Sequence, residues 1–266
     1  MKTVIDKNTG EVKYCFFGET GINRKNEGLK SLMGFVIHKS NSINDPGEVN
    51  IVFRGSRSGA ASRNLNPLGG TWNPDWKTDL DLTRKMLIPD DEINKSSNVL
   101  VAVGFSRTIK SISGSLKKVL IKINERNDDF PPTKITVTGH SLGGALAVHF
   151  ASSILHGSKR YLGDWPWSDL KVITYGAPAS GNTELGFSLL ESGVSITRIY
   201  VSGDSISTQT NMMSKSHFGT EIKLQHLFTG GTADQNVTPH NLQLIKWSLV
   251  NRILDLLYPL TGVKYS

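Results

Sequence analysis

One stretch of the sequence decides the fold, and it reads Lys134-Ile135-Thr136-Val137-Thr138-Gly139-His140-Ser141-Leu142-Gly143-Gly144-Ala145-Leu146-Ala147. It begins with β-branched residues, which are typical of a strand. It ends with small and apolar residues, which are typical of a packed helix. Between them stands the pattern Gly-x-Ser-x-Gly, in which glycines allow strand and helix to approach closely. The stretch therefore predicts a strand, a sharp turn that exposes Ser141, and a helix that reaches Leu155.

Strands and helices alternate on both sides of this turn. Apolar residues at helical spacing predict one helix over 105–126 and an amphipathic helix over 240–258. Runs of β-branched and apolar residues bounded by turn residues predict strands over 32–38, 48–53, 170–175, 195–201 and 221–228. Residues 1–30 are polar and mixed. This order predicts an α/β fold with a central, mostly parallel sheet, whose functional sites lie at the carboxyl ends of strands.

The composition sets limits on the partners of the chain. Its 266 residues are 38% hydrophobic and carry a net charge of +7, which indicates a globular protein, expected here as a single domain over 1–266. The positive charge favours anionic partners such as nucleic acid or an anionic lipid surface. No zinc-finger or RNP signature is present, so we expect no nucleic-acid partner.

The single cysteine, Cys15, excludes an intramolecular disulfide and a cysteine-based zinc cage. We expect neither a metal nor another cofactor. Charged residues stand among the first seven positions, which therefore form no apolar leader segment. No apolar run reaches 18 residues, so no membrane-spanning helix is expected. These features predict a location in the cytoplasm, or export by a route that needs no leader.

A nucleophilic serine needs a base and an acid that orients the base. In a strand–turn–helix arrangement of this kind the chain order is serine, acid, histidine. Asp204 directly follows the predicted strand 195–201, where the acid is expected. Asp164 and Asp169 precede a strand and fit less well. The alternative for Asp204 is a residue that only caps a turn.

Three histidines follow Asp204 in the chain, namely His217, His226 and His240. His240 stands after Pro239 at the entry of the last predicted helix, on a loop that suits a general base. His226 falls within a predicted strand, and His217 precedes that strand. The sequence favours His240, and it leaves His217 and His226 open.

Two N–H donors are expected to stabilise the oxyanion of a tetrahedral intermediate. The residue after the nucleophile, Leu142, supplies one from its backbone. Ser56 follows the predicted strand 48–53 and is the candidate for the other. Its neighbour Arg54 has two interpretations, a ligand for an anionic substrate group or a structural residue.

A long, turn-rich segment follows this strand. The range 57–75 is too long for an ordinary connection, which indicates a functional loop or lid. Leu65, Leu68 and Trp72 would then cover the site and open on a lipid surface. The alternative is an ordinary loop packed on the surface.

These residues resemble the class 3 lipase family, the fungal-type lipases of the α/β-hydrolase fold, most strongly over residues 45–245. The best match is the nucleophile motif. The resemblance is carried by the runs 51–56, 75–80, 103–105, 138–147, 175–178 with Gly181-Asn182, and 217–221. It implies an α/β-hydrolase fold with nucleophile Ser141, acid Asp204, base His240 and oxyanion donors at Ser56 and Leu142. It also implies that His217 is not catalytic.

The chain departs from the family pattern in several places. Twenty positions separate Ser56 from Trp76, where fungal members have a shorter helical lid. The usual proline after the acid is absent, and the 36 positions from Asp204 to His240 are few for the family. The disulfides of secreted fungal members cannot form. In the lack of a leader segment and of disulfides, the chain is similar to bacterial or intracellular members, some of which are phospholipases exported as effectors.

The expected function is that of a serine carboxylic-ester hydrolase acting on lipids, of the phospholipase A or triacylglycerol lipase type. The expected partner is a lipid or membrane surface, together with an inhibitory protein if the enzyme is stored in the cytoplasm. The alternatives are an esterase for short or aromatic esters and a non-catalytic lipid-binding protein on the same fold.

Overall fold

The structure is a computed structural model that describes residues 2–5, 12–20, 29–39, 47–56, 84–86, 98–125, 132–161, 168–208, 216–225 and 245–246. Several residues predicted from the sequence lie outside these ranges. They are the lid residues Leu65, Leu68 and Trp72, the alternative acid Asp164, and the histidines His226 and His240.

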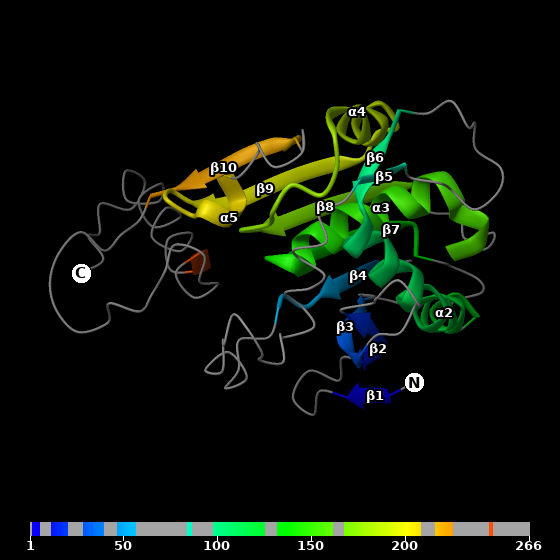
Figure 1. The fold of residues 1–266 in the computed structure, drawn as a ribbon. Helices are drawn as coiled ribbons and strands as arrows, with labels where there is room; N and C mark the ends of the chain where they lie inside the picture. The colour runs from blue at the N-terminus through cyan, green and yellow to red at the C-terminus, as the bar shows by residue number, and fades with distance from the viewer. Residues whose placement is uncertain are drawn as a thin grey trace, which may run out of the picture.

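One eight-stranded sheet organises the described residues (Figure 1). Its first half is antiparallel, and its second half is parallel. In spatial order the strands are β1 (Lys2–Ile5), β2 (Val12–Thr20), β3 (Leu29–Lys39), β4 (Glu48–Phe53), β7 (Lys134–His140), β8 (Asp169–Tyr175), β9 (Ser195–Val201) and β10 (Thr220–Leu224). The pairs β4–β7, β7–β8, β8–β9 and β9–β10 are all parallel, which confirms the predicted α/β architecture.

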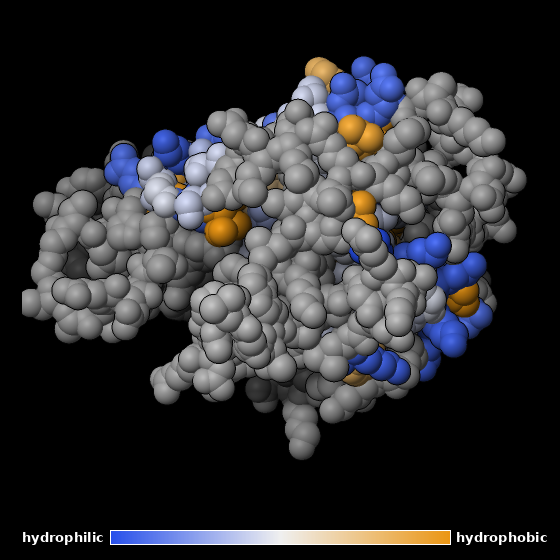
Figure 2. Space-filling view, viewed as in Figure 1, coloured by the Kyte–Doolittle hydropathy of each residue, from blue (hydrophilic) through white to orange (hydrophobic). Residues whose placement is uncertain are grey.

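Helices cover this sheet. Helix α3 (Leu142–Tyr161) packs on β4, β7 and β8, and α2 (Val103–Glu125) packs on β2 and β3 beside α3. The short hairpin of β5 (Arg84–Met86) and β6 (Leu100–Ala102) leads directly into α2. Two shorter helices are α4 (Thr183–Glu191) and α5 (Ser205–Thr208). Hydrophilic side chains gather over the outer face of α2, as the amphipathic pattern predicts (Figure 2).

The two faces of the sheet have separate apolar clusters. On the α3 face, Phe53 of β4 contacts Phe16 and Phe150, with ring centroids 5.3 and 5.7 Å apart. On the opposite face, Ile245 packs with apolar side chains of β9 and β10. Alternate residues of β9 therefore serve different clusters: Ile196 belongs to the first and Val201 to the second. Side chains of a strand point to the two faces of the sheet in turn, so one strand can contribute to both clusters.

Most of the predicted elements are confirmed with changes at their ends, whereas the predicted helix 240–258 lies outside the described residues except for 245–246. Strands β4 and β9 have the predicted bounds, and α3 continues past Leu155 to Tyr161. The predicted strand 221–228 is shorter, because β10 ends at Leu224. The segment 1–30, which showed only a polar and mixed pattern, contains β1 and β2. These strands pair with each other and with β3. Within the described part of the chain, no helix combines the length and apolarity needed to cross a bilayer.

Candidate active site

Ser141 occupies a strained turn between β7 and α3. Its φ is 55°, which makes it the one non-glycine residue with positive φ within the described ranges. A side chain in this conformation costs about 1–2 kcal/mol, so the turn persists only where the surrounding structure holds it. Its N–H donates to the Tyr175 carbonyl at 2.9 Å, and its carbonyl accepts from the Gly144 N–H at 2.9 Å. The predicted sharp turn is thus confirmed, with Ser141 at the carboxyl end of β7.

The two glycines of the motif allow this turn to form. A Cβ atom on Gly139 would overlap the backbone of Gly143, and a Cβ on Gly143 would overlap the Phe53 carbonyl oxygen. Backbone therefore packs directly on backbone at both positions. The second contact brings the start of α3 against the end of β4.

The end of β4 lies beside Ser141. A Cβ built on Gly55 would lie 3.5 Å from the Ser141 Cβ and 2.9 Å from the His140 carbonyl oxygen. Ser56 is the next residue, so the two predicted oxyanion donors come from segments in contact. Leu142 opens α3, and the first N–H groups of a helix have no acceptor within it. The arrangement has the form of a two-sided anion site, with the positive end of a helix dipole on one side.

Arg54 is used to hold this loop. Its N–H donates to the Met33 carbonyl at 2.9 Å, and its side chain donates to the Leu32 carbonyl, to the Gly55 carbonyl at 2.7 Å and to the Ser31 hydroxyl at 3.0 Å. These contacts tie the end of β4 to β3. They favour the structural interpretation of Arg54 over that of a substrate ligand.

Asp204 is buried in a tight turn at the carboxyl end of β9. Its side chain is at the N-cap of α5, where Oδ1 accepts from the Ile206 N–H at 2.9 Å and from the Ser207 N–H at 3.4 Å. The residue is 1% exposed. Its own N–H donates to the Val201 carbonyl at 3.1 Å, across Gly203 with φ 88°.

The parallel sheet brings Ser141 and Asp204 to the same edge. Ser141 follows β7 and Asp204 follows β9, with β8 between the two strands. Asp169, the alternative acid, opens β8 and lies at the opposite edge, where it pairs with Lys171 at 3.0 Å. The structure therefore separates the two described acid candidates and leaves Asp204 on the side of the serine.

His217 lies in a different environment. It precedes β10, so it enters the sheet from the amino side rather than following a strand. Burial and the nearby Arg198 lower the pKa of His217 to about 4. Its Nε2 is buried without a hydrogen-bond partner, beside a small cavity of about 20 Å³ that Thr174, Ser180 and Arg198 help to line. This site is unlike that of a base hydrogen-bonded to a nucleophile.

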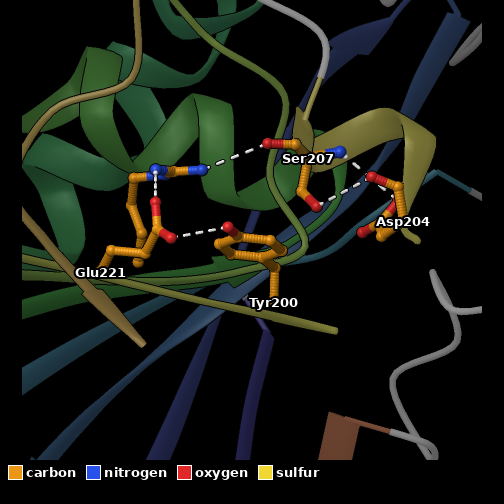
Figure 3. A network of polar contacts seen from close by, with 5 residues as sticks. Tyr200, Asp204, Ser207 and Glu221 are labelled. Carbon is orange, nitrogen blue, oxygen red and sulfur yellow. Dashed lines mark hydrogen bonds and ion pairs between the residues drawn. The ribbon is translucent and has the colours of Figure 1, made fainter. Parts of the chain in front are cut away.

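One part of the site has no counterpart in the sequence predictions. Arg198, Tyr200 and Glu221 form a polar network that reaches α5 (Figure 3). Glu221 lies 23 positions after Arg198 and 21 after Tyr200, and only the pairing of β9 with β10 brings it to them. A local sequence pattern carries no signal for such contacts.

Comparisons with known proteins agree with this geometry. The family profile described as lipase (class 3) matches residues 68–213, which is more than half of the chain and includes Ser141 and Asp204. A curated relative, phospholipase A1-Igamma2 of Arabidopsis thaliana, is 30% identical over 138 residues, covering 44% of this chain and 26% of the relative. The chain thus spans about a quarter of the length of that relative.

Solved lipase structures have the same fold. The lipase of Rhizopus microsporus var. chinensis superposes with a TM-score of 0.51 at 19% identity, over 84% of this chain and 60% of the lipase. A triacylglycerol lipase of Penicillium expansum gives a TM-score of 0.51 at 15% identity, over 85% of this chain and 68% of the lipase. These similarities confirm the α/β-hydrolase fold. Together with the profile match over Ser141 and Asp204, they lead to one conclusion: the chain belongs to the class 3 lipase family.

Proposed function

We propose that this protein is a serine carboxylic-ester hydrolase that acts on lipids. The observation that carries the proposal is the strained Ser141 at the carboxyl end of β7, with the end of β4 packed against it. A turn that holds a serine in the left-handed region stores backbone strain. Such strain is found where a side chain must be presented to a substrate.

The reaction follows from the order of the groups. His240 takes the proton of the Ser141 hydroxyl while Oγ attacks the ester carbonyl, and it then donates that proton to the leaving alcohol. Water repeats the cycle on the acyl-enzyme and releases the fatty acid and the free serine. Asp204 orients the imidazole and stabilises its cation. The backbone N–H groups of Leu142 and Ser56 stabilise the oxyanion.

The position of Ile245 supports His240 as the base. Ile245 packs against Val201, three positions before Asp204. Ile245 lies five positions after His240, and a chain of that length spans at most about 18 Å. The backbone thus returns to the strand that carries the proposed acid. His217, in contrast, lies half-buried next to Arg198 on the other face of the sheet.

Charge and relatives together suggest a phospholipid substrate cleaved at an acyl ester. The net charge of +7 attracts the chain to anionic membranes. The curated relative is named a phospholipase A1, whereas a structural neighbour is named a triacylglycerol lipase. Both names describe hydrolysis of fatty-acyl esters. The charge favours the phospholipid, and the segment 57–75 would act as the lid over it.

The test is fatty-acid release from liposomes containing anionic phospholipid and, separately, from a triglyceride emulsion. We expect release by the wild-type protein, preferentially from the liposomes, and none by Ser141→Ala. Asp169→Asn is the matched control, because it removes a carboxylate at the opposite edge of the sheet. Release from the emulsion alone would replace phospholipid with triacylglycerol as the substrate. Liposome binding without release from any ester would favour a non-catalytic lipid-binding protein.

A further inference from the structure

A half-buried arginine connects the last two strands of the sheet to the turn that carries Asp204 (Figure 3). Arg198 of β9 and Glu221 of β10 are register partners in a parallel pair, so their side chains lie on the same face. One guanidinium nitrogen, Nη1, donates to Glu221 Oε2 at 3.1 Å. The other, Nη2, donates to the backbone carbonyl of Ser207 in α5 at 3.2 Å.

The guanidinium is fixed from more than one side. Tyr200 donates its hydroxyl to Glu221 Oε1 at 2.7 Å, so both carboxylate oxygens are occupied. The Arg198 Cζ also lies 5.2 Å from the centroid of the Tyr200 ring, a cation–π distance. The Arg198 side chain is 14% exposed, against 48% for Glu221. A desolvated guanidinium held by three groups has little freedom to move.

The contact with Ser207 leads directly to Asp204. The Ser207 N–H donates to Asp204 Oδ1 at 3.4 Å, and the Ser207 hydroxyl donates to the Asp204 carbonyl at 3.3 Å. Helix α5 has only four residues, and a single turn does not persist without outside support. Arg198 supplies such support by donating to the Ser207 carbonyl of α5. The N–H groups at the start of α5 bind the Asp204 carboxylate.

We infer that Arg198, braced by Glu221 and Tyr200, is a positioning residue that holds the Asp204 carboxylate in its working orientation through α5. The inference rests on the proposed role of Asp204 as the acid of the triad. Arg198 does not touch the reacting atoms. Its effect on the reaction passes through the orientation of Asp204 and hence of the base.

The geometry requires arginine rather than any cation. A planar fork donates to Glu221 and to the Ser207 carbonyl at once, whereas a lysine ammonium is a single point charge. Arg198→Lys therefore keeps the charge beside Glu221 and loses the bridge to α5. We expect kcat to fall about tenfold with KM unchanged, because small displacements of catalytic groups slow the chemical step more than they weaken binding.

A double-mutant cycle tests the inference. The kcat and KM of Arg198→Lys, Asp204→Asn and the double variant are measured on a chromogenic nitrophenyl ester, which allows slow turnover to be followed. If Arg198 acts through Asp204, then Arg198→Lys lowers kcat about tenfold in the wild type and less than about twofold in Asp204→Asn. Asp169→Asn, which breaks another ion pair of the same sheet, is the control and should leave kcat unchanged.

An equal loss of kcat in both backgrounds, or an equal loss in Asp169→Asn, would overturn the inference. If Asp204→Asn itself retains wild-type kcat, the proposed acid is wrong and the inference falls with it, which is a distinguishable result. Should Arg198→Lys not fold, Tyr200→Phe removes one hydroxyl from the brace with little change in packing. That variant should lower kcat severalfold in the wild type and not in Asp204→Asn, and additive losses would again overturn the inference.

Discussion

Gly55 packs against Ser141, so the end of β4 and the turn after β7 are in close contact. A methyl group on Gly55 would meet the His140 carbonyl oxygen at 2.9 Å and the Ser141 Cβ at 3.5 Å. The Arg54 side chain holds the same loop by donating hydrogen bonds to the Leu32 carbonyl of β3 and to the Gly55 carbonyl. Any group added at Gly55 must therefore move either the proposed nucleophile or the loop that carries the Ser56 donor.

Gly55→Ala should impair turnover more than folding. Displacing one oxyanion donor costs about 10²–10³ in kcat. We expect at least about a tenfold loss of kcat with a small change in the midpoint of thermal unfolding. The control is Gly114→Ala on the exposed side of α2, where a Cβ would meet nothing within 4 Å. That change should raise the free energy of unfolding by up to about 1 kcal/mol and leave kcat unchanged. Unchanged kcat in Gly55→Ala would contradict the packing described for this loop.

The strain at Ser141 makes a prediction about stability. Both Ser141→Ala and Ser141→Gly remove the hydroxyl and should abolish turnover. Only glycine also removes the Cβ from the left-handed conformation at φ 55°. Ser141→Gly should therefore be more stable than Ser141→Ala by about 0.5–1 kcal/mol, measured by urea denaturation. Equal stability of the two variants would mean that the turn stores no strain.

Much of this site could be predicted from sequence because the turn is local. The β-branched run before Ser141 and the small residues after it specify strand, turn and helix within about a dozen positions. Asp204 was predicted for the same reason, since it directly follows β9, a short run of β-branched and apolar residues. The elements found only in the structure depend on distant partners. Strand β2 is fixed by its pairing with β1 and β3, and it carries an irregularity between Phe16 and Phe17 that breaks the pattern.

The remaining parts of the predicted site lie outside the described residues. His240, the lid residues and the single-domain extent over 1–266 stay predictions. Arg198 shows why contacts between distant elements are harder to predict than a local motif. Its contacts join β9, β10 and α5, and no spacing in the sequence indicates them. Helix α4 was missed because it has nine residues and depends on its cap.

Asn182 is expected to stabilise the fold through that cap. Its Oδ1 accepts from the N–H groups of Leu185 at 3.3 Å and Leu100 at 2.9 Å, and its Nδ2 donates to the Asn98 carbonyl at 2.7 Å. Asn182→Ala would leave buried backbone groups unpaired and should lower the free energy of unfolding by about 2–3 kcal/mol. Ser192→Ala, at the exposed end of α4, removes one local hydrogen bond and should change stability by less than about 0.5 kcal/mol. Equal effects of the two changes, measured by chemical denaturation, would contradict this role.

The buried His149 predicts a dependence of stability on pH. Burial in α3 lowers its pKa from 6.5 to about 4. The unfolded chain therefore binds more protons than the native one between pH 6.5 and pH 4, and the free energy of unfolding falls as pH drops through this window. The full contribution is about 3 kcal/mol.

His149→Leu removes the titrating group at that position. Denaturation at pH 7 and at pH 4.5 should show a smaller loss of stability in His149→Leu than in the wild type. Parallel losses in the two proteins would show that His149 does not carry the effect.

The central claim, that Ser141 is an activated nucleophile, is tested most directly by covalent labelling. The protein is treated with a lipid-like phosphonate ester, which reacts with activated serines, and the modified peptide is identified by mass spectrometry. We predict one adduct, on Ser141, that forms much more slowly in Asp204→Asn and in His240→Ala. No adduct in the folded protein, an adduct on another residue, or equal rates in all three proteins would contradict the claim.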